Sequence, residues 1–157
     1  MGYATTKSPL GSKDHRPAII MQFTVPPSLD DVIDLARAHL ENLKKRMIAG
    51  FREKIEDVRF NGDCENLERS NYTVLNVSLP PSDINDMLLF NLDIAKISAS
   101  GGSACSSGSE IGSHVLGALG VSPDRGNVRF SFGKYNTEAD IDYAVNTVAE
   151  MYKTITI

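Results

Sequence analysis

The residues best suited to chemistry lie in the segment Ser100–Ser109, which consists of glycine, serine and alanine around a single cysteine, Cys105. A structural cysteine usually lies among apolar residues and behaves as a small hydrophobic side chain. No large apolar neighbour is present here to bury the thiol, so the sequence predicts an exposed loop that carries one nucleophile. Backbone N–H groups of a glycine-rich turn can stabilise a thiolate in such a loop.

The composition of this segment alone leaves other interpretations open. A phosphate-binding loop of the Walker type requires glycine and lysine followed by serine or threonine, and the sequence has no such motif. A plain linker is the second alternative, although a linker does not usually join two well-formed elements of one small domain. The residues by themselves therefore do not decide between a reactive cysteine and these alternatives.

The overall composition restricts the class of protein. The chain has 157 residues, of which 41% are hydrophobic, and this suffices for one domain with its own core. The net charge of -4 gives no basic excess for binding nucleic acid, and no apolar run approaches the ~20 residues of a membrane span. Two cysteines, Cys64 and Cys105, and three dispersed histidines favour neither a disulfide framework nor a zinc site. We therefore expect a reduced, cytoplasmic protein in which Cys64 has no role.

The elements that would position Cys105 follow from the spacing of apolar residues. Residues 1–27 lack periodicity and are expected to be a flexible leader or an expression remnant, whereas residues 28–157 are expected to form one domain. The predicted helices cover 29–55, 82–92, 114–119 and the segment from Thr137 onwards, with Ser28, Ser82 and Ser113 as capping residues, and the predicted strands cover 58–60, 72–79, 95–99 and 128–132.

Two further expectations concern the packing of these elements. Pro80 and Pro81 are expected to end the second strand, and the basic run Lys44-Lys45-Arg46 is expected to lie on the solvated side of the first helix. Strands and helices are interleaved without a regular β-α-β order. The sequence therefore predicts an α+β fold with a small, mostly antiparallel sheet and helices packed on it.

Several segments closely resemble the C-terminal part of cysteine desulfurases, which are class V aminotransferase-fold enzymes that use pyridoxal phosphate. The resemblance covers roughly residues 28–152, and its most specific part runs from about 100 to 143. The matching motifs are residues 102–109, 113–120 and 128–133, followed by Thr137-Glu138 and Ile141-Asp142. The long serine and glycine loop is similar to the group that feeds iron–sulfur cluster assembly and other sulfur-transfer pathways. The resemblance implies the small domain of a fold-type I pyridoxal phosphate enzyme.

The resemblance also implies roles for two residues. Cys105 would be the nucleophile that takes sulfur from L-cysteine, so that the products are L-alanine and a persulfide on Cys105. Arg129 would hold the substrate carboxylate, because a guanidinium offers paired hydrogen bonds to a carboxylate. Without the resemblance, Arg129 reads as an exposed strand residue between the core-facing Val128 and Phe130. The implied partners are L-cysteine, a sulfur acceptor such as an iron–sulfur scaffold protein, and a second copy in a full-length homodimer.

The sequence departs from the family in lacking the cofactor lysine. That lysine lies in a Ser-x-His-Lys motif of the large domain, and no such motif occurs here, since Lys96 and Lys134 lie in strand or strand-end contexts. We therefore expect no cofactor-binding residue in this chain and no activity without a large pyridoxal phosphate-binding domain. Two smaller departures are Gly101 and Gly112, where the family often has serine and proline.

The remaining charged residues are weaker candidates for catalysis. His114 is expected at the start of a short helix, and Glu138, Asp140 and Asp142 are expected to be first-turn helix charges rather than acid or base catalysts. Two alternatives to the desulfurase domain stay open. The chain could be a stand-alone persulfide carrier or interaction module, or a structural remnant without activity.

Overall fold

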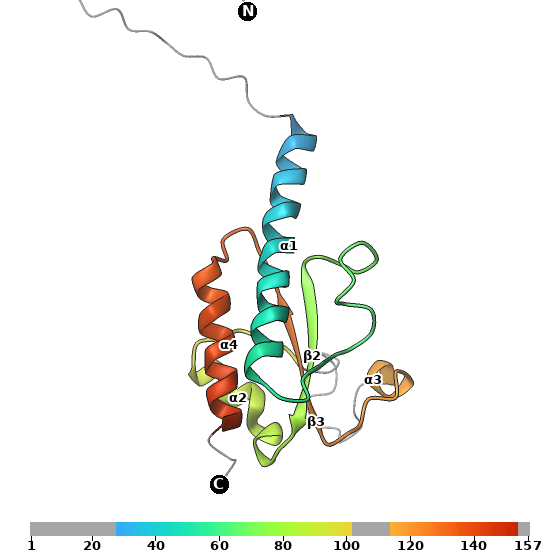
Figure 1. The fold of residues 1–157 in the computed structure, drawn as a ribbon, viewed down its shortest axis with the longest axis vertical. Coiled ribbons are helices and arrows are strands. Elements are labelled where there is room, and N and C mark those ends of the chain that lie inside the picture. The colour runs from blue at the N-terminus through green and yellow to red at the C-terminus, as the bar shows by residue number, and fades with distance from the viewer. Residues whose placement is uncertain (1–27, 102–113, 154–157) are drawn as a thin grey trace, which may run out of the picture.

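The first helix, α1, begins at Leu29 because Ser28 and Asp31 cap each other there, with the Asp31 N–H donating to Ser28 Oγ over 3.1 Å. The computed structural model describes residues 28–101 and 114–153 (Figure 1). The elements in chain order are α1 (Leu29–Lys54), β1 (Arg59–Phe60), β2 (Val74–Pro81), the 3₁₀ helix η1 (Asp83–Met87), α2 (Leu88–Ile94), α3 (His114–Ala118), β3 (Arg125–Ser131) and α4 (Glu138–Lys153). Across these described ranges, no helix is both long and apolar enough to cross a membrane.

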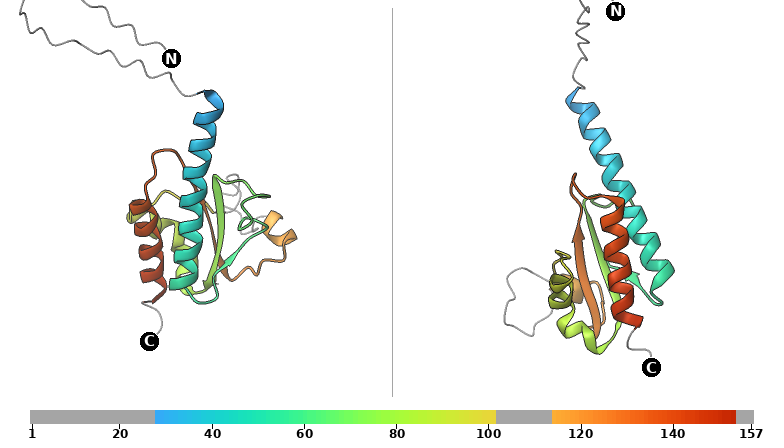
Figure 2. Two further views of the ribbon diagram at one scale, coloured as in Figure 1. Left: turned by 45° about the horizontal axis from the view of Figure 1, so that its top comes forward. Right: turned by 90° about the vertical axis from the view of Figure 1, so that its left-hand side faces the viewer.

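The three strands form one antiparallel sheet in the order β1-β2-β3. Alternate residues of β2 (Leu75, Val77 and Leu79) are fully buried, and Val128 and Phe130 lie opposite them on β3. Helices α1 and α4 lie side by side over this apolar face (Figures 1 and 2). The predicted α+β fold, with a small antiparallel sheet and packed helices, is therefore confirmed.

The contact between α1 and α4 depends on a small residue. A Cβ atom at Gly50 would lie 3.0 Å from Val145 Cγ1, so this glycine lets the two helices approach closely. Helix α4 begins as predicted, because the Asp140 N–H donates to Thr137 Oγ1 over 3.2 Å and the Thr137 N–H donates to the Asp140 carboxylate over 2.8 Å. Both long amphipathic helices thus have the bounds that their sequence pattern predicts to within two residues.

The prediction that the whole basic run of α1 is solvated is wrong for Lys44. Its side chain is completely buried, and Nζ donates to Ser70 Oγ over 2.9 Å and to the Asn71 carbonyl over 2.8 Å. Burial lowers the pKa of this amine. Its neighbour Arg46 is exposed, as expected, and bonds to Glu138 and Asp142 of α4. The irregular segment between β1 and β2 covers Lys44, and helix periodicity carries no information about such a cover.

The segment from residue 80 to residue 100 differs from prediction in three respects. Strand β2 continues through Pro81, because a register irregularity after Leu79 lets Pro81 pair with Arg125. Ser82 makes no capping bond to η1, and its Oγ is a buried hydroxyl without a partner in the described structure. Residues 95–99 form no strand. They leave α2 through Lys96, whose φ is 62°, and the Ile97 N–H donates back to the Leu92 carbonyl over 2.9 Å.

Candidate functional site

A row of polar residues crosses the sheet on the face opposite α1 and α4. The Asn61 N–H donates to the Asn76 carbonyl over 3.0 Å, Asn76 pairs with Arg129, and Arg129 forms a further bridge with Ser100. Directly paired residues of antiparallel strands place their side chains on the same face. Asn61, Asn76, Arg129 and Ser100 therefore share one face, although they come from four separate parts of the chain.

Arg129 is held at both its backbone and its side chain by Ser100. The Ser100 N–H donates to the Arg129 carbonyl over 3.1 Å, and the Arg129 N–H donates to the Ser100 carbonyl over 2.6 Å. Arg129 Nε also donates to Ser100 Oγ over 3.1 Å. The guanidinium is exposed, and within residues 28–101 and 114–153 none of the ion pairs includes it. Its Nη groups can therefore bind an incoming anion.

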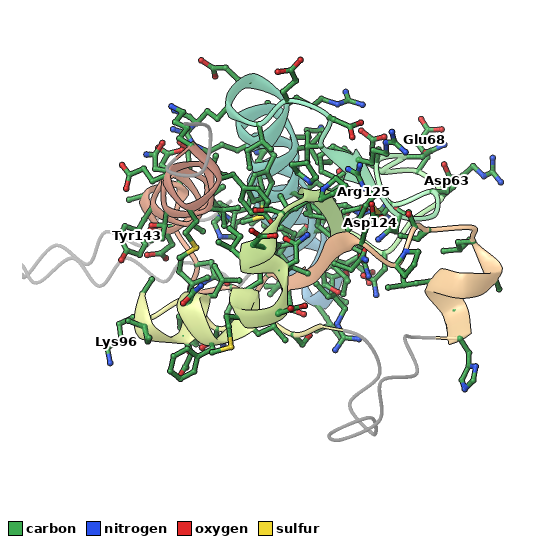
Figure 3. The ribbon with its side chains drawn as sticks, turned by 90° about the horizontal axis from the view of Figure 1, so that it is seen from below. Asp63, Glu68, Lys96, Asp124, Arg125 and Tyr143 are labelled. Atoms are coloured by element: carbon green, nitrogen blue, oxygen red, sulfur yellow. The ribbon has the colours of Figure 1, made fainter. Side chains whose placement is uncertain are left out.

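A second arginine on β3, Arg125, has the opposite character. Its guanidinium is buried and donates to Asp57 Oδ2 over 2.6 Å, to Ser78 Oγ over 2.9 Å and to the Ser78 carbonyl over 3.0 Å (Figure 3). These bonds from Arg125, together with those from Arg59, hold the pKa of Asp57 below its usual range. Arg125 thus fixes the start of β3, whereas Arg129, four residues later, is available to a ligand.

Asn127 extends the polar row along the sheet. Asn61 Nδ2 donates to Asn76 Oδ1 and to Asn127 Oδ1, each over 2.8 Å. A cleft of about 400 Å³ lies beside this cluster and is lined by Asn61, Ser78 and Arg125 among others. Arg129 does not line this cleft, and its side chain is exposed.

Ser100 and Gly101 are the last described residues before the segment that contains Cys105. Cys105 lies outside the described residues, as does Ser113. A Cβ atom at Gly101 would lie 2.9 Å from Leu89 Cδ1 and 3.3 Å from the Asn127 carbonyl oxygen. Glycine at this position therefore lets the chain pass between α2 and β3 as it leaves the bridge to Arg129. A serine here would require Leu89 to move.

The other cysteine, Cys64, lies in a different environment. It is half-buried, and its Sγ donates to the Asn76 carbonyl over 3.5 Å. Burial raises the pKa of the Cys64 thiol, so less of it is thiolate at neutral pH. Its hydrogen bond to the backbone of β2 gives Cys64 a structural contact.

The remaining residues considered from the sequence do not join the polar row. His114 begins α3 and is exposed, and Lys134 lies over the ring of Tyr135, 4.8 Å from its centroid. Lys96 projects from the end of α2 (Figure 3). The sequence pattern does not indicate the roles of Ser100 and Arg125. Ser100 lies within the glycine- and serine-rich segment, but no local pattern indicates that it pairs with a residue 29 positions later.

The sequence profile described as Aminotransferase class-V matches residues 31–144. Two curated relatives, each named cysteine desulfurase IscS, come from Photobacterium profundum and Salmonella schwarzengrund. Each is 38% identical to this chain over 71% of its length and over 26% of the relative. A solved structure titled NifS-like protein has a TM-score of 0.62 and 26% identity over 80% of this chain and 30% of that one.

A NifS-like protein from Rickettsia africae has the same fold, with a TM-score of 0.59 and 20% identity. It covers 78% of this chain and 31% of that one. The chain thus spans about a quarter of the length of the curated relatives that it matches.

Proposed function

This chain belongs to the class V aminotransferase family, and from that membership we propose that it is the small, cysteine-bearing domain of a cysteine desulfurase. Such an enzyme removes sulfur from L-cysteine and gives L-alanine and an enzyme persulfide. The observation that supports the proposal best is the pair Arg129 and Ser100. It joins an anion-binding group, which has no carboxylate partner among the described residues, to the start of the segment that contains Cys105.

Arg129 would bind the carboxylate of L-cysteine. The bond from Nε to Ser100 leaves both Nη groups of the guanidinium for a paired contact with the two carboxylate oxygens. The position of Arg129 between the buried Val128 and Phe130 fixes its backbone. A fixed arginine loses little freedom on binding, which favours both affinity and orientation of the substrate.

Cys105 would accept the sulfur. Its thiolate forms a bond to the sulfur of L-cysteine while the carbon–sulfur bond of the substrate breaks, and the electron pair and a proton go to carbon to give L-alanine. Cys105 follows Gly101 by four residues. An extended chain spans at most about 14 Å over that distance. The thiol is therefore tethered near a carboxylate held by Arg129, and an acceptor such as an iron–sulfur scaffold protein would then take the sulfur.

We expect none of Lys44, Lys96 and Lys134 to hold pyridoxal phosphate. Lys44, although buried, already donates its Nζ to Ser70 and Asn71, and Lys134 is exposed. Lys96 borders a cavity of about 390 Å³, but Asp140 also lines that cavity and its carboxylate would repel a phosphate. We therefore place the cofactor in a separate large domain, which would supply the electron-accepting chemistry. The proposed setting is cytoplasmic, where thiols stay reduced.

A sulfide assay tests this assignment. The purified chain is incubated with pyridoxal phosphate, L-cysteine and dithiothreitol, and released sulfide is measured with Cys105→Ala as the control. We expect no sulfide above that control, because the cofactor lysine is missing. Sulfide that depends on Cys105 would show that this chain itself anchors the cofactor, and the placement of the cofactor in another domain would then be wrong.

A stand-alone persulfide carrier is the second candidate. The exposed Arg129, bonded to Ser100 at the start of the segment that contains Cys105, favours it as well. An external low-molecular-weight persulfide would load a carrier by transferring its outer sulfur to the Cys105 thiolate and releasing a thiol. Mass spectrometry of the loaded chain, followed by addition of an acceptor thiol, measures this transfer. Efficient loading and release without any large domain would favour the carrier over the desulfurase domain.

A further inference from the structure

The side chain of Asn76 lies next to that of Arg129 on the open face of the sheet. Asn76 of β2 and Arg129 of β3 are directly paired. The backbone N–H and C=O of Arg129 bond to Ser100 rather than to Asn76, so the two residues form a non-hydrogen-bonded pair, in which side chains approach most closely. Their Cβ atoms are therefore expected about 4.5–5.5 Å apart. The pair places an amide beside the guanidinium that is proposed to bind substrate.

A chain of hydrogen bonds fixes the direction in which the Asn76 amide points. The Arg125 carbonyl can only accept, so the amide nitrogen of Asn127 faces it, over 2.9 Å. Asn127 therefore turns its Oδ1 toward Asn61, and Asn61 donates through Nδ2 to Asn127 and to Asn76, each over 2.8 Å. Asn76 accepts this bond at its Oδ1. The N–H groups of the Asn76 amide therefore point away from Asn61.

These N–H groups are available to a ligand. Within the part of the chain that the structure describes, no acceptor bonds to Asn76 Nδ2. Unlike the Ser82 hydroxyl, this nitrogen is not closed off from solvent. The side chain is half-buried, and its backbone is held because the Asn76 carbonyl accepts from the Asn61 N–H over 3.0 Å. A donor fixed in this way loses little freedom when it binds a ligand.

The guanidinium of Arg129 offers its donors close to the same surface. Its Nε bonds to the hydroxyl of Ser100, which is a short side chain, and this bond keeps the guanidinium near the sheet. A carboxylate has two oxygens with about four acceptor positions. It can therefore accept from both Nη groups of an arginine and, at the oxygen nearer β2, from an amide as well. With hydrogen bonds of about 2.9 Å, a carboxylate joins donors that lie roughly 5–7 Å apart.

We propose that Asn76 is a second substrate-binding residue, which donates through Nδ2 to the carboxylate that Arg129 holds. This inference rests on the proposed function and adds a contact from β2 to the site. Two donors from separate strands fix the direction of the carboxylate, whereas a single guanidinium allows it to pivot. Asn76 carries no charge, so it adds this contact without a second cation that would repel Arg129.

A titration of the full chain with sodium acetate tests the proposal without any cofactor. Acetate presents the carboxylate alone, and heteronuclear NMR follows the Nε–H group of Arg129 and the side-chain amide of Asn76. Both signals should shift with the same dissociation constant. The side-chain amide of Asn127 is the internal control and should stay in place, because it already donates to the Arg125 carbonyl. Sodium chloride at equal ionic strength corrects for screening.

Two variants show whether the Asn76 donor contributes to binding. Asn76→Ala should weaken acetate binding at Arg129 about threefold or more, because a hydrogen bond to a charged group is lost. Ser131→Ala is the matched control, since Ser131 is exposed and lies two residues after Arg129 on the same face. It should change the dissociation constant by less than about 1.5-fold. Arg129→Gln should abolish the shift at Asn76.

The outcomes separate this proposal from the role of Arg129. A shift at Arg129 with none at Asn76, or equal dissociation constants for wild type and Asn76→Ala, would overturn the proposal and leave the role of Arg129 standing. The absence of any shift at both residues would overturn the contact with Asn76 and count against Arg129 as well.

A complete enzyme distinguishes a substrate contact from a structural role. In a chimera, residues 28–153 of this chain replace the matching segment of the Photobacterium profundum relative. Asn76→Ala should raise the KM for L-cysteine about three- to tenfold and leave kcat within about twofold. A loss of kcat at unchanged KM would show that Asn76 only supports the fold of the site. A chimera that releases no sulfide would refute the proposed function, whereas the acetate titration would still decide whether Asn76 binds a carboxylate.

Discussion

Replacing Arg125 by methionine should destabilise the domain substantially, because this guanidinium joins three parts of the sheet. It contacts Asp57 after α1, Ser78 on β2 and, through its own backbone, the start of β3. Methionine has a similar length and is apolar, so the substitution removes the hydrogen bonds while filling most of the volume. The buried Ser78 hydroxyl would then lose the donor that Arg125 supplies, and the Ser78 carbonyl would lose one of its hydrogen bonds.

The magnitude follows from the two bonds to Ser78. A hydrogen bond from a charged group contributes about 1.5–3 kcal/mol, and a buried polar group left unpaired costs about 1–3 kcal/mol. We therefore expect Arg125→Met to lower the free energy of unfolding by about 2–4 kcal/mol in urea denaturation. Arg59→Met is the matched control, since Arg59 contacts the same carboxylate from an exposed position. Its loss should cost less than about 1 kcal/mol.

The pH dependence supplies an independent check. The bonds from Arg125 lower the pKa of Asp57 in the folded state relative to the unfolded state. The stabilisation from this shift is fully present above the unfolded pKa near 4 and is lost as the pH falls through the folded pKa. The gap between wild type and Arg125→Met should therefore narrow below about pH 4. If Arg125→Met and Arg59→Met were equally stable, or if the gap widened in acid, the structural role assigned to Arg125 would be wrong.

Three further predictions concern the strand and the two thiols. Gly126→Ala should lower the free energy of unfolding in urea by about 1–3 kcal/mol, because the new Cβ would lie 2.6 Å from Asn85 Oδ1. Gly133→Ala is the control and should change the free energy of unfolding by less than about 0.5 kcal/mol, because its Cβ would meet nothing closer than 3.7 Å. Iodoacetamide at pH 7 should modify Cys105 at least about ten times faster than Cys64, because burial raises the pKa of the Cys64 thiol. Peptide mapping measures both rates of modification. Equal rates in the folded chain would contradict the assignment of Cys105 as the reactive thiol. Arg129→Gln should leave the free energy of unfolding in urea unchanged within about 0.5 kcal/mol, since the side chain is exposed. In a chimera in which residues 28–153 replace the matching segment of the Photobacterium profundum relative, the same substitution should raise the KM for L-cysteine by at least about tenfold. A KM equal to that of wild type would exclude a contact with the substrate carboxylate.

The sequence was most informative where the apolar face of an element packs in the core. The apolar spacing of α4 and of the second half of α1, and the alternation of Val128 and Phe130 around Arg129, predicted the burial that the structure shows. Short apolar runs were less informative, because residues 95–99 suit a strand and a helix exit equally well by pattern. Pro81 favours the end of a strand by pattern, although an irregularity in the register accommodates it in β2.

The sequence predicts the individual residues of the candidate site, but it does not predict the contacts between them. Cys105 and Arg129 follow from the motif that they occupy, and both assignments stay predictions. The bridge between Ser100 and Arg129, and the burial of Lys44, depend on contacts between segments more than 25 residues apart. Local periodicity carries no information about such contacts.

The narrow passage at Gly101 has a consequence for how sequences of this kind can diverge. A Cβ atom at 101 would fall 2.9 Å from Leu89 Cδ1, which is the end of a partly exposed side chain, so any side chain at 101 requires that leucine to turn aside. A homologue with serine at 101 should therefore carry either leucine in another rotamer or a smaller residue at 89. In this chain, Gly101→Ser should be tolerated better together with Leu89→Ala than alone, a coupling that a double-mutant cycle can measure.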